Sequence, residues 1–149
     1  MRAILQRVRH GRVSVAGKVI AEIGQGYVIL LGVSVDDGEE QAFWLAKKCA
    51  NLRLFEDAHG KMNLSLDEVG GEVLVVSQFT LYADARKGRR PSFTRAALPE
   101  KAKPLVDSFI DTLIAEGIPV QVGEFGEHML VDIENDGPVT LILERNAGG

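Results

Sequence analysis

The stretch Tyr27-Val28-Ile29-Leu30-Leu31-Gly32-Val33 decides the fold of this chain, because it is a continuous apolar run that follows the turn signal Gly24-Gln25-Gly26. Such a run, without polar alternation, is typical of a strand that is buried on both faces. Shorter strand-like segments precede it, and Gly11 and Gly17 separate them as turns. The sequence therefore predicts four strands in its opening part, at residues 3–9, 13–15, 18–23 and 27–33.

Two helices are predicted further along the chain. The first is expected to begin at Asp36 or Asp37, with a glutamate three residues on as its capping-box partner. Its apolar positions follow helical spacing and are Phe43, Ala46, Ala50 and Leu54. The second spans roughly residues 99–116, because Pro99 suits a first turn and Gly117 suits a C-terminal cap. Its apolar face is formed by Leu105, Phe109, Ile110, Leu113 and Ile114.

Strands are predicted again at residues 72–76, 120–125, 129–134 and 139–144. Because the strands and the two helices do not alternate regularly, the pattern indicates an α+β domain rather than a doubly wound sheet. We predict a curved, barrel-like β-sheet with two flanking helices. The length of 149 residues indicates a single domain over residues 1–149.

The composition is that of a globular protein, with 46% hydrophobic and 26% charged residues. No apolar run approaches the ~20 residues that span a bilayer, and the N-terminus lacks a signal-peptide core. The single cysteine, Cys49, cannot form an intrachain disulfide, so nothing indicates an oxidising compartment. We expect a cytoplasmic protein with no membrane association.

The net charge of −4 conceals a segregation of charge along the chain. Residues 1–21 hold basic side chains and no acid, and residues 86–103 hold a denser basic cluster with Glu100 as its one acid. A local positive field of this kind attracts phosphate although the chain is acidic overall. The alternative is a solvated surface whose basic groups pair with acids elsewhere. RNA phosphate is the favoured partner, because the denser cluster directly follows residues 77–81.

Metal and nucleophile chemistry can be weighed from residue spacing. The potential metal ligands show no CxxC or HExxH spacing, and they are His10, His59, His128 and Cys49. We expect neither a metal nor another cofactor. A triad stays open as an alternative, with Ser77 or Thr80 activated by His128. Asp84 or Asp132 would then orient the histidine, although Ser77 lacks the Gly-x-Ser-x-Gly context.

Two polar motifs follow apolar runs. Ser77-Gln78-Phe79-Thr80-Leu81 ends a predicted strand, and N–H groups around Phe79 and Thr80 can serve as an oxyanion hole for an ester carbonyl. In most proteins such residues only finish a strand and cap a turn. The second motif is Asn135-Asp136-Gly137-Pro138-Val139-Thr140. Asn-Asp-Gly alone is typical of a hairpin turn, but the proline removes a donor and makes a cis peptide bond possible.

Through these two motifs the chain resembles the D-aminoacyl-tRNA deacylases of the bacterial and eukaryotic type, which carry Ser-Gln-Phe-Thr-Leu and Asn-x-Gly-Pro-Val-Thr. Both motifs are present without a mismatch, and the resemblance runs from Met1 to the last strand near Glu144. It implies the same barrel-like fold and a homodimer. It also implies an ester hydrolase that releases D-amino acid from D-aminoacyl-tRNA, and glycine from mischarged alanine tRNA, as a proofreading activity.

The resemblance also implies roles for single residues. The bond between Gly137 and Pro138 is expected to be cis and to reach into the active site of the other subunit. A main-chain wall there leaves room for a hydrogen on the α-carbon but not for a side chain, so L-amino acids are rejected by clash. Phe125 and Met129 match positions that line the pocket of the 3′-terminal adenosine, with core packing as the alternative for Met129. Glu127 stands where many relatives have a small residue.

The basic residues of the loop are expected at the phosphates of the acceptor stem, and they are Arg86, Lys87, Arg89 and Arg90. Alternatively, residues 91–93 hold this loop against the partner subunit. For the reaction we prefer RNA-assisted hydrolysis, in which the vicinal ribose hydroxyl orients water and no protein group attacks. Thr80 as a nucleophile is the alternative. Two other functions stay open, a non-catalytic RNA-binding module and a serine or threonine esterase for small esters.

Overall fold

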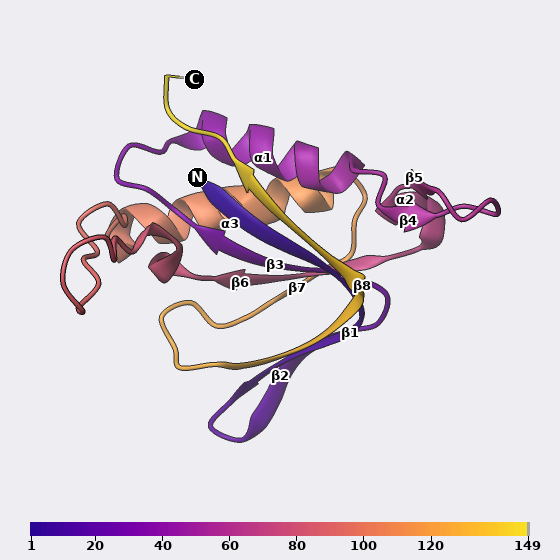
Figure 1. Cartoon of the computed structure of the whole chain (residues 1–149), viewed down its shortest axis with the longest axis horizontal. Coiled ribbons are helices and arrows are strands. Elements are labelled where there is room, and N and C mark those ends of the chain that lie inside the picture. The colour runs from indigo at the N-terminus through magenta and orange to yellow at the C-terminus, as the bar shows by residue number, and fades with distance from the viewer. Residues whose placement is uncertain (149) are drawn as a thin grey trace.

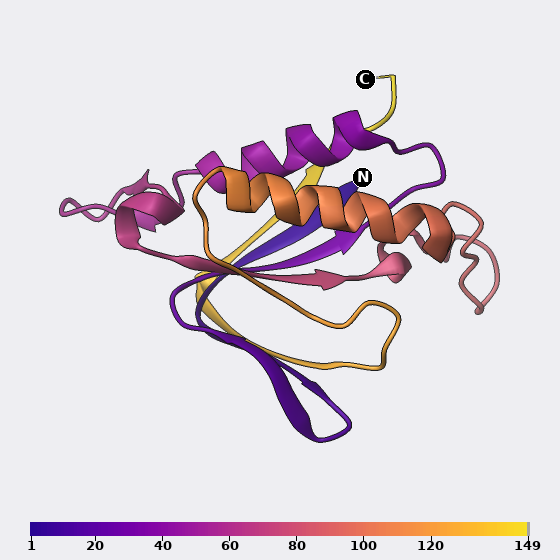
Figure 2. The same cartoon turned by 180° about the vertical axis from the view of Figure 1, so that it is seen from behind.

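The computed structural model describes residues 1–148 and places two long helices on one face of a strongly curved sheet (Figures 1 and 2). In chain order the elements are β1 (Arg2–Val15), β2 (Lys18–Ile23), β3 (Gly26–Gly32), α1 (Glu39–Asn51), β4 (Phe55–Glu56), β5 (Met62–Leu64), α2 (Leu66–Val69), β6 (Glu72–Ser77), the 3-10 turn η1 (Phe79–Tyr82), α3 (Pro99–Ala115), β7 (Val120–Val122) and β8 (Leu130–Glu144). Within residues 1–148, no helix is both long and apolar enough to cross a membrane.

The apolar run predicted at residues 27–33 is the central strand β3. It pairs with β1 antiparallel on one side and with β6 parallel on the other, in the order β2-β1-β3-β6-β7. The strand β1 pairs with β3 along its first half and with β2 near its end, while β8 follows its other edge throughout. The sheet therefore curls into a nearly closed barrel, and the predicted single-domain α+β fold is confirmed.

Two of the predicted strand breaks are wrong. Residues 2–15 form one strand, because Gly11 allows close packing rather than a turn: a Cβ there would lie 2.7 Å from Val28 Cγ2. Residues 130–144 also form one strand, which bulges at Gly137 and Pro138 instead of ending. The strand predicted at residues 120–125 stops at Val122.

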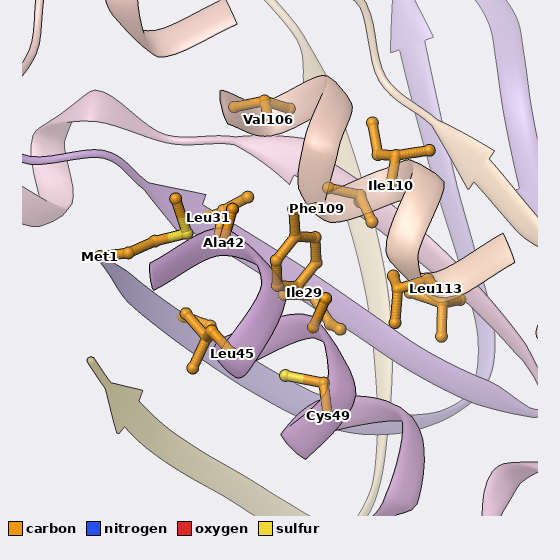
Figure 3. Packing of buried hydrophobic residues seen from close by; sticks show 14 of the residues in the cluster. Met1, Ile29, Leu31, Ala42, Leu45, Cys49, Val106, Phe109, Ile110 and Leu113 are labelled. Atoms are coloured by element: carbon orange, nitrogen blue, oxygen red, sulfur yellow. The ribbon is translucent and has the colours of Figure 1, made fainter. Parts of the chain in front are cut away.

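The core has two parts, one on each face of the sheet. Between the sheet and the helices, Ile29 and Leu31 pack against Leu45 of α1 and Phe109 of α3 (Figure 3). Inside the curl of the sheet, a smaller cluster is formed by Val8, Val13, Ala21, Ile23, Val28, Leu74 and Val76. Every β3 residue from Tyr27 to Leu31 except Leu30 is fully buried, as expected for a strand with apolar clusters on both faces.

Both helices occur near their predicted positions, but some details differ. The helix α1 begins at Glu39 after Gly38, and Gln41 Oε1 accepts the Gly38 N–H at 2.7 Å. Asp37 is not the cap, because its buried carboxylate accepts the Met1 ammonium at 2.6 Å and the Ser34 N–H at 2.7 Å. The predicted apolar faces are also too wide, since Phe43 is 45% exposed and Ile114 is 55% exposed.

Candidate active site

A cavity of about 560 Å³ opens where the parallel strands β3 and β6 end. Its lining comes from the ends of these strands, from residues 77–79, from parts of the segment 93–102, from residues 125–129 and from Val131. The two apolar clusters meet at this place, because Phe125 packs on the helix side and Met129 packs inside the curl. A largely apolar cavity with a few polar groups at its rim is the usual form of a small-ligand site.

The turn η1 sits against the end of β3 because residue 32 is a glycine. A Cβ at Gly32 would lie 2.9 Å from Leu81 Cβ and 3.1 Å from Gln78 O, so a larger residue would push the turn outward. Arg2 holds the other end of the turn, donating to Leu81 O at 2.5 Å with its guanidinium 4.8 Å from the Tyr82 ring centroid. Burial also raises the pKa of Tyr82 to about 12.

The start of η1 leaves two main-chain donors free, and the residue that carries the first of them, Phe79, lines the cavity. The Gln78 N–H bonds Leu31 O at 2.8 Å and the Leu81 N–H bonds Gln78 O at 3.2 Å. Among the hydrogen bonds of residues 1–148, the N–H groups of Phe79 and Thr80 have no acceptor, as expected for the first residues of a helical turn. These are the donors that an oxyanion hole requires.

Of the predicted pocket residues, Ser77, Gln78, Phe79, Phe125 and Met129 all line the cavity. The exposed side chain of Thr80 lies outside the lining, and its hydroxyl accepts a hydrogen bond from the Gln78 amide. Met129 is both a core residue and a pocket residue, so the two alternatives for it do not exclude each other. Glu127 and His128 also line the cavity.

The alternative catalytic triad is not assembled. Among the described residues, no hydrogen bond joins His128 to Ser77 or Thr80. The candidate aspartates are engaged elsewhere: Asp84 bonds Arg86, which lowers the pKa of its carboxyl to about 2, and Asp132 accepts from Arg12 at 2.9 Å. The thiol of Cys49 is also unsuited to attack, because burial in the core raises its pKa to about 12.

The motif at residues 135–140 forms a bulge in β8. Gln6 pairs with Thr140 and Val8 pairs with Asn135, so four residues of β8 lie opposite one residue of β1. The Asn135 side chain closes the bulge, since it accepts the Val139 N–H and donates to the Thr140 hydroxyl, both at 2.9 Å. The Gly137-Pro138 bond at its tip is cis, and both residues are exposed and lie outside the cavity of their own chain.

Arg7 supports this bulge from inside, and the sequence motifs did not single it out. Its buried guanidinium donates Nε to Asp136 O at 3.1 Å and Nη1 to Leu54 O at 2.7 Å. Nη2 lies 3.9 Å from Glu56 Oε1. A signal was present in the alternation of β1, because Ala3, Leu5 and Arg7 share its buried face and a charged group there requires partners.

The basic residues of the N-terminal segment and of the loop at residues 86–90 divide into those that pair with an acid and those that do not. Most N-terminal basic residues pair with acids of β8, as Arg2 does with Glu144 and Arg12 with Asp132, so this segment is not a free positive surface. In the loop, Arg86 pairs with Asp84 at 2.8 Å. The remaining three form no ion pair within residues 1–148 and are all exposed: Lys87, Arg89 and Arg90.

Comparison with known proteins finds a matching family and similar proteins over nearly the full length of the chain. Residues 4–144 match the protein family described as D-Tyr-tRNA(Tyr) deacylase. The chain is 60% identical to a D-aminoacyl-tRNA deacylase of Chloroflexus aurantiacus, over 97% of this chain and 90% of that protein. It is 56% identical to one of Symbiobacterium thermophilum, over 97% and 95% of the two chains.

Two solved structures have a similar fold. A protein named c-Myc DNA Unwinding Element Binding Protein superposes with a TM-score of 0.91 at 40% identity, over 99% of this chain and 100% of that chain. A probable eukaryotic D-amino acid tRNA deacylase superposes with a TM-score of 0.84 at 19% identity, over 97% and 98% of the two chains. The second likeness concerns the fold alone.

Proposed function

The chain belongs to the D-aminoacyl-tRNA deacylase family, and from this premise we propose that its cavity binds the aminoacylated 3′-adenosine of tRNA while a Gly137-Pro138 wall excludes L-amino acids. As a member of this family, the chain is a hydrolase of D-aminoacyl-tRNA that acts in translation proofreading. The observation that carries the proposal is the cavity at Ser77–Phe79, because Phe79 lines a largely apolar chamber and its main-chain N–H has no acceptor within residues 1–148. Such an enzyme acts in the cytoplasm, where aminoacyl-tRNA is used.

In the proposed reaction, the ester carbonyl oxygen accepts hydrogen bonds from the N–H groups of Phe79 and Thr80. Phe125 and Met129 then hold the adenosine. The vicinal ribose hydroxyl orients a water molecule, whose oxygen forms a new bond to the carbonyl carbon. The ester C–O bond breaks, and the free amino acid leaves while the ribose oxygen takes up a proton. Stabilisation of the oxyanion contributes most of the rate enhancement, so no protein nucleophile is required.

The chiral wall is proposed to come from a second copy of the chain. Gly137 and Pro138 are exposed at the tip of a braced bulge, away from the cavity of their own chain. The outer face of β8 also exposes Leu130 by 64% and Ile142 by 67%, which is apolar surface that a two-fold dimer would cover. In the dimer each bulge would enter the partner's cavity beside the α-carbon of the aminoacyl group.

The direct test is hydrolysis of D-tyrosyl-, L-tyrosyl- and glycyl-tRNA by the purified protein, without added metal. We expect turnover of the D-tyrosyl and glycyl substrates and no detectable turnover of the L-tyrosyl substrate, because only the L side chain meets the wall. Equal turnover of both tyrosyl substrates would leave an esterase without the proposed wall. Tight tRNA binding without turnover would favour a nucleic-acid-binding module, an alternative in keeping with the name of the similar c-Myc DNA Unwinding Element Binding Protein.

Thr80→Ala separates the two mechanisms proposed for the ester. Its hydroxyl lies outside the cavity lining, and its N–H remains after the substitution. We expect kcat for D-tyrosyl-tRNA to fall by less than roughly tenfold, because the Thr80 hydroxyl only helps to position substrate or water and no nucleophile is lost. Single-turnover kinetics with saturating enzyme measure this step. A loss of nearly all activity with unchanged tRNA binding would instead assign the attack to Thr80.

The exposed basic loop is proposed to bind acceptor-stem phosphates. Reversal of two charges, in Arg89→Glu with Arg90→Glu, should weaken tRNA binding and lower the slope of log K against log salt by about one for each phosphate that is no longer neutralised. A matched control reverses two exposed lysines of α1, in Lys47→Glu with Lys48→Glu, and should have a much smaller effect. Equal effects of the two double variants would mean that only net charge matters.

A further inference from the structure

Two exposed phenylalanines stand together at the rim of the cavity. Phe79 is 56% exposed and Phe93 is 40% exposed, and both line the cavity. Their ring centroids lie 5.1 Å apart at an interplanar angle of 60°, an edge-to-face arrangement. Both residues are therefore partly open to solvent although the rings contact each other. Neither ring is needed for the oxyanion donors, which are main-chain groups, or for the adenosine walls at Phe125 and Met129.

The fold holds Phe93 in this position by closing the basic loop at its base. Asp84 and Ser92 exchange two main-chain hydrogen bonds, of 2.7 Å and 2.8 Å, so residues 85–91 form a closed loop. Arg86 reinforces the neck by bonding the Asp84 carboxylate. On the other side of Phe93, the Ala96 N–H bonds Phe93 O at 3.1 Å. The ring therefore emerges from the foot of the loop that carries the unpaired cations.

The surroundings of the pair indicate what it binds. Exposed aromatic rings next to a positively charged segment are the two components with which proteins hold single-stranded nucleic acid, by stacking bases and attracting phosphates. The 3′ end of tRNA is single-stranded. If the terminal adenosine lies inside the cavity, the nucleotide before it must leave through the rim. The basic loop then lies further along the same path, toward the acceptor stem.

We propose that Phe79 and Phe93 form a stacking platform for the base that precedes the terminal adenosine. This inference rests on the proposed function, because it takes the adenosine to be in the cavity. The platform orients the strand so that the ester reaches the donors of η1, and it couples the basic loop to the pocket. It predicts that a substrate with two nucleotides gains an advantage over a substrate with one, and that the advantage depends on an aromatic ring at residue 93.

The test compares D-tyrosyl-adenosine, which has one nucleoside, with the D-tyrosyl ester of cytidylyl-adenosine, which also has the preceding nucleotide. The readout is kcat/KM for the cytidylyl-adenosine ester divided by kcat/KM for D-tyrosyl-adenosine. Phe93→Leu should lower this ratio roughly tenfold, the magnitude expected for one lost base stack. Phe93→Tyr keeps the ring and should keep the ratio of the unmodified chain. Phe43→Leu is the matched control, since Phe43 is an exposed phenylalanine on α1, and it should also keep the ratio.

The platform and the deacylase function are tested by different outcomes. An unchanged ratio in Phe93→Leu overturns the platform while leaving the deacylase function intact, whereas absence of turnover of both substrates by the unmodified chain overturns the function itself. Size-exclusion chromatography covers the remaining possibility. If Phe93→Leu dissociates a dimer, the ring is a subunit contact and the platform is rejected. Phe79→Leu provides a second variant that should lower the same ratio, because it removes the other ring and keeps the main-chain N–H.

Discussion

Gly137→Ala is expected to lower kcat/KM for D-tyrosyl-tRNA by roughly 100-fold or more, because it displaces the bulge that forms the proposed wall. The residue has a φ of +130°, where a side chain is strained. A Cβ there would lie 2.7 Å from Val139 Cγ2 and 3.1 Å from both Arg7 Nη2 and Val139 N. The Val139 N and the Arg7 guanidinium cannot move away easily, since Asn135 accepts the Val139 N–H and Arg7 is buried.

A control substitution at a second glycine separates the effect of Gly137→Ala on stability from its effect on activity. Gly17 also has a positive φ, of +79°, but no atom of residues 1–148 lies within 4 Å of a Cβ built there. Gly17→Ala should therefore cost about 1 kcal/mol of unfolding free energy with full activity, while Gly137→Ala should cost about 2–4 kcal/mol and lose activity. Urea unfolding and initial rates measure the two quantities. Equal activity losses in both variants would mean that the bulge has no special role.

A mixing experiment tests whether Gly137 contributes to the cavity of its own chain or to the cavity of the partner subunit. Phe125→Ala damages the adenosine wall and is expected to be poorly active by itself. In a mixed dimer of the two variants, one cavity combines an intact Phe125 with an intact Gly137 from the partner. Activity should therefore reappear when Gly137→Ala and Phe125→Ala chains are refolded together. If Gly137 served its own cavity, both cavities of the mixed dimer would be damaged and no activity would return.

The parts of the fold that sequence predicts well are those with strong local patterns. The strand at residues 27–33 is predictable because a double-sided apolar run has few other interpretations, and α3 is predictable because Pro99 and Gly117 bracket it. The start of α1 is not predictable from local sequence, because it depends on a group that is distant in the chain. Local capping rules assign the Asp37 carboxylate to the helix start, but in the structure this carboxylate accepts a hydrogen bond from the Met1 ammonium. Local rules also wrongly split β8, since a bulge and a turn use the same residues.

The candidate site divides in the same way. Its motifs are visible in the sequence because Ser77–Leu81 and Asn135–Thr140 are contiguous, and the cavity does include Ser77, Gln78 and Phe79. The supporting arginines are not, because their partners are remote in sequence. Arg2 bonds Leu81 O across 79 positions, and Arg7 bonds Asp136 O across 129 positions. From the sequence alone such residues are only charged positions on a strand. Their carbonyl partners become known only from the fold.

Arg7→Ala should be the most damaging single substitution on this side of the molecule. It leaves two carbonyl groups, Leu54 O and Asp136 O, without their charged donor in a buried site. Breaking buried interactions of a charged group costs about 3–5 kcal/mol, a large part of the stability of a domain of this size. The bulge would also lose its inner support, so kcat/KM should fall together with the unfolding free energy.

The neighbouring arginine supplies the control, because Arg9 lies 3.6 Å from a carboxylate oxygen of the same Asp136 but is 74% exposed. Arg9→Ala should cost less than about 1 kcal/mol. Arg7→Lys tests geometry separately from charge: a lysine keeps the cation but cannot reach both carbonyls with a rigid fork. If the lysine variant unfolds at nearly the normal urea concentration yet loses D-tyrosyl-tRNA hydrolysis, the guanidinium positions the bulge for catalysis. If all three variants keep their activity, the bulge does not depend on Arg7 and its support lies with Asn135.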